Sequence, residues 1–224
     1  GLERFDDEIG DDIMPHARKY FANILLPFSA LVLNLVEKVT EMGLALDMIC
    51  PDHGVMWRKD PSKIINAYVE WSKQEPKRKA VVVYDTMWHS TEQMAETMVE
   101  ALGSQGVDAQ PMHLRTWHRS DVMTEVLDAG AVIVGSPTIN NGLFPTVSDF
   151  LTYMKGLKPQ NKIGAAFGSY GWSGEAVKLL NQELDAMKFN RVDPGLKIQY
   201  VPDSQGLEAC RELANKIAQA LPER

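Results

Sequence analysis

The sequence of 224 residues contains only two cysteines, Cys50 and Cys210, and they lie far apart in the chain. Neither belongs to a Cys-x-x-Cys pair, so the pattern excludes a zinc ribbon, a rubredoxin centre and a disulfide framework. The chain also begins without the basic region and apolar stretch of a secretory signal. These absences predict a protein of the reducing cytoplasm.

Long apolar runs and basic clusters are missing as well. No segment has the roughly 18 consecutive apolar residues of a membrane-spanning helix, so the sequence predicts no membrane partner. The formal net charge is -7. Nucleic-acid binding depends on clustered Lys and Arg, so nucleic acid is excluded as a partner. With 45% apolar and 24% charged residues, the chain has the composition of a globular protein with a substantial core.

Two unlike halves meet at the polar stretch 72–79. After it, strand, loop and helix alternate five times. The first, third and fourth strands are almost wholly apolar, which is typical of a parallel sheet covered by helices on both faces. The pattern predicts an α/β fold over residues 79–224, a doubly wound five-stranded parallel sheet with strand order 2-1-3-4-5. Strands are expected at residues 80–84, 107–114, 131–135, 163–167 and 196–201, and helices at 90–102, 121–128, 145–157, 174–187 and 204–221.

The first half has apolar residues at helical spacing. This spacing predicts helices over 14–26 and 28–42, with Pro27 between them, and a further helix over 61–71 with Asp60 as its N-cap. Between these helices, a short apolar run leads into Pro51-Asp52-His53-Gly54. By residue chemistry alone, a single His before Gly is an ordinary loop residue.

Ligands of such a sheet bind at the carboxyl ends of its strands, so the loops there are the places to examine. The first is 84–91, which offers hydroxyls at Thr86, Ser90 and Thr91 beside the free N–H groups of a helix N-terminus. It lacks the patterns of a nucleoside triphosphate loop and of a dinucleotide loop, so a terminal monophosphate fits it best. The alternative is that Ser90 and Thr91 only cap the helix.

Two further loops follow the third and fourth strands. The loop 135–145 carries two amides, Asn140 and Asn141, which can hydrogen-bond the edge of a heteroaromatic ring. The loop 168–174 has glycines that let backbone approach a ligand, and Tyr170 or Trp172 can lie against a flat ring. Each loop taken singly can also be explained as turn chemistry. Three such loops at one edge of a sheet favour a ligand.

Taken in order, the three loops closely resemble the FMN-binding loops of flavodiiron proteins, the cytoplasmic O2 and NO reductases of anaerobes. The resemblance spans essentially the whole chain and implies a flavodoxin-like domain with one non-covalent FMN. It implies that the phosphate is held by Thr86, Met87, Trp88, His89, Ser90 and Thr91. The isoalloxazine edge would be lined by Pro137, Thr138, Ile139, Asn140, Asn141 and Gly142. The segment that closes over the ring would be Ser169, Tyr170, Gly171, Trp172, Ser173 and Gly174.

The same resemblance implies that residues 1–75 are the C-terminal end of a metallo-β-lactamase-like domain with a non-haem diiron site. His53 matches the segment that supplies the last iron ligand. The family's other ligands, an H-x-E-x-D-H cluster with a later His and Asp, are not in this sequence. We therefore expect FMN but no working diiron centre in these 224 residues, no catalytic residue among them, and a longer parent enzyme.

The function implied is electron transfer. FMN would take electrons from rubredoxin or a similar small donor and pass them to the diiron site, which reduces O2 to water or NO to N2O, in a head-to-tail homodimer. One alternative is a stand-alone flavodoxin-like electron carrier, which would not need the first 75 residues. Another is an NAD(P)H-dependent flavin or quinone reductase, although no separate nicotinamide motif is present.

The remaining histidines are weaker candidates for a role in the site. His16, His113 and His118 have polar or charged neighbours in the sequence, and we expect them to be solvated surface groups. His89 lies within the predicted phosphate loop. It can donate to a phosphate or only pack beside Trp88.

Overall fold

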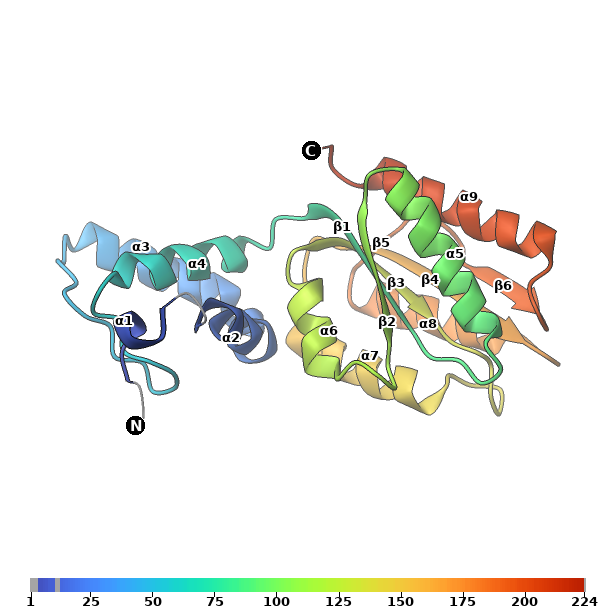
Figure 1. Ribbon diagram of the computed structural model, residues 1–224, viewed down its shortest axis with the longest axis horizontal. Helices are drawn as coiled ribbons and strands as arrows, with labels where there is room; N and C mark the ends of the chain where they lie inside the picture. Colours follow the sequence, from blue (N-terminus) through green and yellow to red (C-terminus); the bar gives the residue numbers. More distant parts are fainter. Residues whose placement is uncertain (1–3, 11–12, 224) are drawn as a thin grey trace. The chain divides into compact units, whose positions relative to one another are not determined.

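The computed structural model describes residues 4–10 and 13–223. The chain divides into two compact units, Gly1–Gln74 and Glu75–Arg224 (Figure 1).

The second unit is built on a parallel sheet with strand order β2-β1-β3-β4-β5. Its long strands are β1 (Lys77–Tyr84), β2 (Asp108–His113), β3 (Ala129–Gly135) and β4 (Ile163–Tyr170). In register, Tyr84 at the end of β1 lies beside His113 on one side and Gly135 on the other. The predicted α/β fold and strand order are confirmed, and the topological switch falls between β1 and β3, where the sheet can receive a ligand.

The fifth position of the sheet differs from the single strand predicted over 196–201. Two short strands fill it, β5 (Asn190–Arg191) and β6 (Leu196–Gln199), and both pair with β4. Between them lie Pro194, which has no N–H to donate to a ladder, and Gly195 at φ +100°. The sheet therefore has six strands rather than five, although the predicted order is kept.

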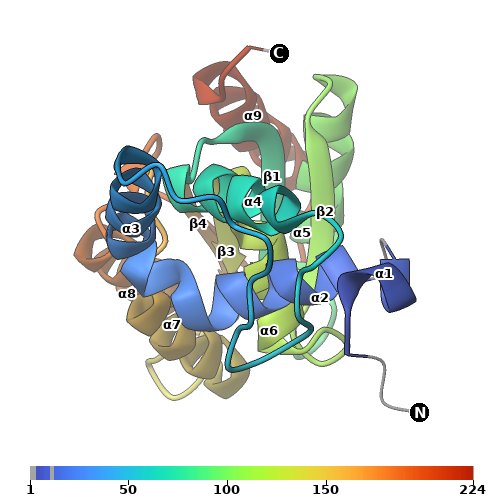
Figure 2. The same ribbon diagram turned by 90° about the vertical axis from the view of Figure 1, so that its left-hand side faces the viewer.

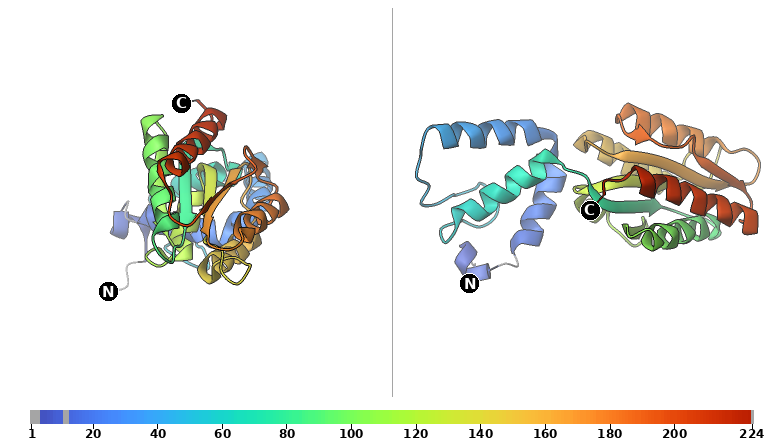
Figure 3. Two further views of the ribbon diagram at one scale, coloured as in Figure 1. Left: turned by 90° about the vertical axis from the view of Figure 1, so that its right-hand side faces the viewer. Right: turned by 90° about the horizontal axis from the view of Figure 1, so that it is seen from above.

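Helices cover both faces of this sheet (Figure 3). On one face lie α5 (Ser90–Ser104) and α9 (Ser204–Ala220). On the other lie α6 (Arg119–Val126), α7 (Pro145–Leu157) and α8 (Glu175–Ala186). Because successive strand residues point to opposite faces, both faces must be apolar. In β1, Ala80 and Val82 belong to the core beneath α5 and α9, and Val81 and Val83 are also fully buried.

The first unit consists of helices and a long loop with isolated β-bridges in its described residues (Figure 2). It contains α1 (Asp6–Ile9), α2 (Ile13–Tyr20), a π-helical turn η2 (Phe21–Leu25), a 3-10 turn η3 (Leu26–Phe28), α3 (Ser29–Glu41) and α4 (Pro61–Lys73). The break predicted at Pro27 is thus a change of helix type rather than an interruption, since π and 3-10 turns can absorb a missing N–H. The predicted N-cap of α4 is confirmed, because Asp60 accepts a hydrogen bond from Ser62 N at 3.1 Å.

The first unit has a small core and a large apolar surface. Phe21 packs between Tyr68 and Trp71, with ring centroids 5.3 and 5.6 Å away. Beside this core lies an apolar cavity of about 1070 Å³ between α2, α3 and α4. Large apolar side chains lie exposed on this unit, among them Ile24, Phe28, Leu31, Leu35, Met42, Leu44, Leu46 and Met48.

One finding here differs from the sequence prediction that no segment could span a membrane. The continuous helical segment Ile13–Glu41 has 29 residues and contains an 18-residue window with a mean hydropathy of 1.5, so it is long and apolar enough by these two criteria. Core helices of water-soluble proteins pass the same test. The prediction counted uninterrupted apolar residues, whereas the hydropathy of this helix is averaged over a stretch with few charges.

Candidate functional site

The three predicted loops lie together at the carboxyl edge of the sheet. Asp85 N donates to the carbonyl of Gly135 at 3.4 Å, which joins the first loop to the end of β3. The hydroxyls of Thr91 and Ser169 lie 2.9 Å apart, which joins the first turn of α5 to the end of β4. Thr138 N donates to the Ser169 carbonyl at 3.0 Å and joins the second loop to the third. The loops therefore form one connected edge.

The first loop fits a phosphate. It ends at the N-terminus of the 15-residue helix α5, where unpaired N–H groups and the helix dipole favour an anion. Thr86 is 5% exposed, and its hydroxyl oxygen has no hydrogen-bond partner among the described residues. A buried hydroxyl without a hydrogen-bond partner lowers stability, so such groups are rare and call for an explanation. A bound ligand that accepts a hydrogen bond from Thr86 would provide one. His89 precedes the helix in the left-handed conformation, at φ +64°.

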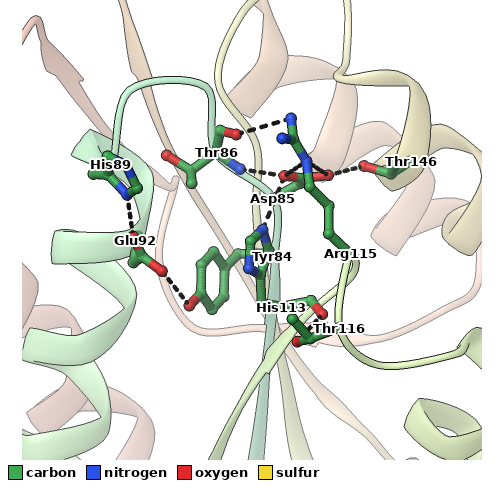
Figure 4. A network of polar contacts seen from close by, with 9 residues as sticks. All are labelled: Tyr84, Asp85, Thr86, His89, Glu92, His113, Arg115, Thr116 and Thr146. Carbon is green, nitrogen blue, oxygen red and sulfur yellow. Dashed lines mark hydrogen bonds and ion pairs between the residues drawn. The ribbon is translucent and has the colours of Figure 1, made fainter.

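Asp85 lies behind this loop in a network of polar contacts (Figure 4). Its side chain is fully buried at the end of β1. It accepts hydrogen bonds from Thr86 N at 2.6 Å and from the Thr146 hydroxyl at 2.5 Å. His113 Nε2 and Arg115 Nε each lie 3.1 Å from it. The buried carboxylate therefore ties the first loop to β2, to the segment after β2 and to α7.

The charge on Asp85 is stabilised by these partners. Burial alone would raise its pKa, but the hydrogen bonds from Thr146, Thr86 N and His113, and then the charge of Arg115, outweigh burial and hold the pKa of Asp85 below its ordinary value. Asp85 is thus an ionised group in the interior.

His113 is not the solvated surface group that the sequence predicted. Its ring stacks on that of Tyr84, with centroids 5.1 Å apart, and its side chain is only 22% exposed. Burial, with the charge of Glu92 next in importance, raises the pKa of Tyr84 to about 12, so the phenol stays neutral. The prediction was wrong because the polar neighbours of His113 in the sequence do not show that β2 pairs with β1 at this position.

The other histidines with predicted roles lie as follows. His89 is 83% exposed, and its Nδ1 lies 2.5 Å from Glu92 Oε2, an arrangement that the sequence did not suggest. His16 is exposed, as expected. His118 is exposed too, but it also caps α6 by accepting from Ser120 N at 3.2 Å.

The second loop makes a tight turn. Ile139 and Gly142 exchange two backbone hydrogen bonds, at 2.8 and 3.2 Å. Asn140 and Asn141 between them both have positive φ, at +49° and +57°. Asn tolerates this left-handed conformation better than other residues that carry a side chain, which explains both amides at these positions. The turn leaves both side chains exposed at the edge of the sheet.

The third loop approaches the second very closely. A Cβ at Gly168 would lie 2.1 Å from the Ser136 carbonyl oxygen, so only glycine lets the ends of β3 and β4 come together here. Trp172 is 99% exposed. An exposed aromatic ring in this loop is suited to cover a flat ligand. Trp88 in the first loop is also exposed.

Sequence reasoning missed the roles of three residues at this edge. Asp85 was treated only as part of the first loop, and Arg115 was not considered. Tyr200 was also missed, although it follows β6 at the same edge, has φ +61° and has its ring beside Gly171. Tyr200 could have been identified from the sequence, because it lies near the end of the predicted fifth strand, and the carboxyl ends of all parallel strands lie at the same edge of the sheet.

The predicted iron ligand, His53, does not belong to a cluster of metal-binding side chains among the described residues. His53 is exposed, and its ring centroid lies 6.0 Å from that of Tyr20. Within residues 4–10 and 13–223 there is no group of three or more His, Cys, Asp or Glu side chains that could hold a metal. The assignment of His53 stays a prediction.

The second unit of the chain matches a known protein family. The family described as Flavodoxin matches residues 82–213, which is more than half of the sequence. The chain belongs to the flavodoxin family. Membership in this family implies FMN as the cofactor, and the loops described above fit it: an anion site at α5, a buried unpartnered hydroxyl and exposed aromatic rings beside it.

Several relatives extend beyond this family domain. The chain is 47% identical over 217 residues to a nitric oxide reductase of Moorella thermoacetica, covering 96% of this chain and 54% of the relative. It is 44% identical to a rubredoxin-oxygen oxidoreductase of Megalodesulfovibrio gigas, covering 98% and 55%. The chain therefore spans about half the length of the curated relatives it matches.

Solved structures give the same result. Rubredoxin oxygen:oxidoreductase from Desulfovibrio gigas matches with a TM-score of 0.95 and 43% identity, over 98% of this chain and 56% of that one. A flavodoxin from the domain Archaea matches with a TM-score of 0.59 and 35% identity, over 63% of this chain and 97% of that one. The predicted resemblance to flavodiiron proteins is thus confirmed as a similarity of sequence and fold.

Proposed function

We propose that residues 79–224 bind one FMN at the carboxyl edge of the sheet and carry electrons through it. The observation that carries this proposal is the Thr86 hydroxyl in the loop before α5, which is buried and has no hydrogen-bond partner among the described residues. A phosphate there would receive a hydrogen bond from Thr86 and from the free N–H groups of the first turn. FMN, when bound, supplies one-electron and two-electron chemistry.

The residues of the chain would hold and shield this cofactor. In the proposal, residues 86–91 bind the phosphate, residues 137–142 line the edge of the isoalloxazine ring, and residues 169–174 close over its face. Trp88 and Trp172 are exposed in the structure and would exclude water from the ring. The second and third loops are joined by backbone, so their spacing around the ring is fixed by the sheet.

The test of this proposal is reconstitution. Purified chain is mixed with FMN, and quenching of flavin fluorescence is measured across a titration, followed by acid release and identification of the bound flavin. We expect saturation at one FMN per chain. A chain that folds, as judged by circular dichroism, but binds no FMN would contradict the proposal.

We further propose that the chain is part of a flavodiiron oxidoreductase of the cytoplasm. In this proposal residues 1–75 are the end of a metallo-β-lactamase-like domain, and His53 is one ligand of a diiron site completed by residues beyond this sequence. The whole enzyme would accept electrons from rubredoxin and reduce O2 to water, NO to N2O, or both, as a head-to-tail homodimer. The similarity to relatives bearing those names over 96–98% of the chain supports this.

The exposed apolar side chains of the first unit also support the proposal. A helical unit with a small core and many exposed apolar residues is expected when the rest of its domain is elsewhere. The test uses the full-length protein loaded with iron and FMN, with O2 and NO consumption followed by electrode in the presence of reduced rubredoxin. Consumption of neither gas by a protein with two irons and one FMN would contradict this assignment.

One observation favours a second candidate function. The archaeal flavodoxin is matched over 97% of its own length by part of this chain. The second unit alone therefore has the extent of a complete electron carrier. Measuring electron transfer to a soluble acceptor in the absence of iron distinguishes this function from the reductase.

A further inference from the structure

The backbone of Thr86 is held on both sides by charged side chains. Its N–H donates to Asp85 Oδ1 at 2.6 Å, and its carbonyl accepts from Arg115 Nη2 at 3.3 Å. Arg115 Nε in turn lies 3.1 Å from Asp85 Oδ1. The three groups form a closed set of contacts, so both peptide groups that flank the Thr86 Cα are held in place without a ligand.

The side chain of Thr86 faces the other way. Figure 4 shows its hydroxyl pointing away from Arg115, while its carbonyl points toward the guanidinium. Because Thr86 N is already occupied by Asp85, the group that Thr86 offers to a ligand is its hydroxyl. The ionisable side chains that contact Asp85 are Arg115 and, from β2, His113, and neither contacts that hydroxyl.

We propose that Asp85 and Arg115 are positioning residues that hold the Thr86 hydroxyl toward the phosphate and thereby set the preference of this site for FMN over riboflavin. This inference rests on the proposed FMN site. Riboflavin has the same ring but lacks the phosphate, so a fault in the orientation of Thr86 weakens FMN binding and leaves riboflavin binding unchanged. A residue that only stabilised the fold would affect both flavins alike.

Two variants test the pair in the whole chain. Arg115→Gln removes the positive charge and the guanidinium donors, and Asp85→Asn removes the negative charge while keeping the shape of the side chain. The dissociation constants of FMN and riboflavin are measured for each by quenching of flavin fluorescence. We expect the ratio of riboflavin to FMN dissociation constants to fall about 10-fold or more in each variant, as for the loss of a charge-assisted hydrogen bond. The double variant should lose little more than the worse single variant, because the two residues act together.

The chain offers matched controls. Arg119→Gln breaks an exposed ion pair with Asp149, and Asp108→Asn changes an exposed aspartate at the other end of β2. Neither residue contacts the loop, so both controls should keep the ratio of the unaltered chain.

The outcomes that overturn the inference are distinct. An unchanged ratio in Arg115→Gln, whether both flavins weaken or neither does, shows that the pair has no role in selecting the phosphate. Since the Arg115 side chain is 54% exposed, this variant decides the question even if Asp85→Asn fails to fold. If the unaltered chain binds neither flavin, the flavin site itself is wrongly assigned, and this inference fails with it.

Discussion

At the scale of single residues, the site depends on two neighbouring side chains that differ in their hydrogen bonding, Thr86 and Asp85. Thr86 is buried and its hydroxyl has no partner in the part of the chain that the structure describes, whereas Asp85 beside it is buried with contacts from four residues. An unpaired buried polar group lowers stability, whereas a fully paired carboxylate is tolerated. The adjacent residues thus have opposite effects: Asp85 makes the loop rigid, and Thr86 keeps a binding group available.

The Thr86→Val substitution tests the first of these roles. Valine keeps the shape and removes the hydroxyl, so the stability of the flavin-free chain should stay the same or rise by up to about 1 kcal/mol. FMN affinity should fall about 10-fold, since a hydrogen bond to a charged phosphate is lost. Chemical denaturation and fluorescence titration measure the two effects. Thr97→Val is the control, because the Thr97 hydroxyl already donates to the Gln93 carbonyl within α5. Lower stability with unchanged FMN affinity would contradict the role.

The two cysteines give a second prediction at this scale. Cys50 is exposed, whereas Cys210 is fully buried in α9, and burial raises the pKa of its thiol to about 11. Since only the thiolate reacts, a chromogenic thiol reagent near pH 8 should titrate one cysteine quickly and the other only after denaturation. The Cys50→Ser variant should show no fast reaction. Two equally fast thiols would mean that α9 does not stay packed on the sheet.

These residues also show what the sequence could reveal. The hydroxyls of the first loop follow directly from an apolar strand that runs into a helix, so Thr86 was identified as a candidate without a structure. The role of Asp85 depends on His113, the last residue of β2, and on Arg115 just after it, and both reach Asp85 only through the β1–β2 register. Contacts of this kind between separate strands cannot be read from spacing along one chain.

At the scale of elements, the distance between the ends of β3 and β4 determines the geometry of the second and third loops. The two strands approach so closely that Gly168 has no room for a side chain next to the Ser136 carbonyl. The sequence predicted β4 and the glycine-containing loop after it, but ascribed those glycines to backbone approach by a ligand. For Gly168, the approaching backbone belongs to the protein itself.

A pair of glycine substitutions tests this explanation. Gly168→Ala should destabilise the chain by about 1–3 kcal/mol, because backbone must shift to admit the Cβ. Gly156→Ala, in α7 with no atom within 4 Å of the added Cβ, should raise stability by up to about 1 kcal/mol. Urea denaturation of both variants measures the difference. Equal effects would show that the contact between strand ends is not tight.

At the scale of the whole molecule, the two units differ in how they bury apolar surface. The second unit has helices on both faces of a sheet and a continuous core. The first unit leaves many large apolar side chains exposed around an apolar cavity. The sequence predicted unlike halves from composition and pattern, and the exposed apolar side chains of the first unit are expected if further chain packs against them, as the proposed function implies.

The corresponding prediction concerns truncation. A chain of residues 75–224 should fold alone and bind FMN with a dissociation constant within about twofold of the full chain, since all three loops and Arg115 are kept. Residues 1–74 alone should bind an apolar fluorescent dye strongly and unfold without cooperativity. Loss of FMN binding on removal of residues 1–74 would show that the flavin site needs the first unit. The full chain at equal concentration is the reference.

The division of the fifth sheet position has a consequence for how the molecule behaves at high concentration. An exposed outer strand can recruit a strand from a neighbouring molecule and seed aggregates. Here that border consists of β5 and the four residues of β6, separated by the turn through Pro194. The Pro194 carbonyl accepts from Asn181 Nδ2 at 2.6 Å, and Asp193 pairs with Lys216 Nζ at 2.8 Å, so the turn is anchored to α8 and α9. This edge therefore offers no long, straight strand for another molecule to pair with, and the interruption disfavours strand addition on this side of the sheet.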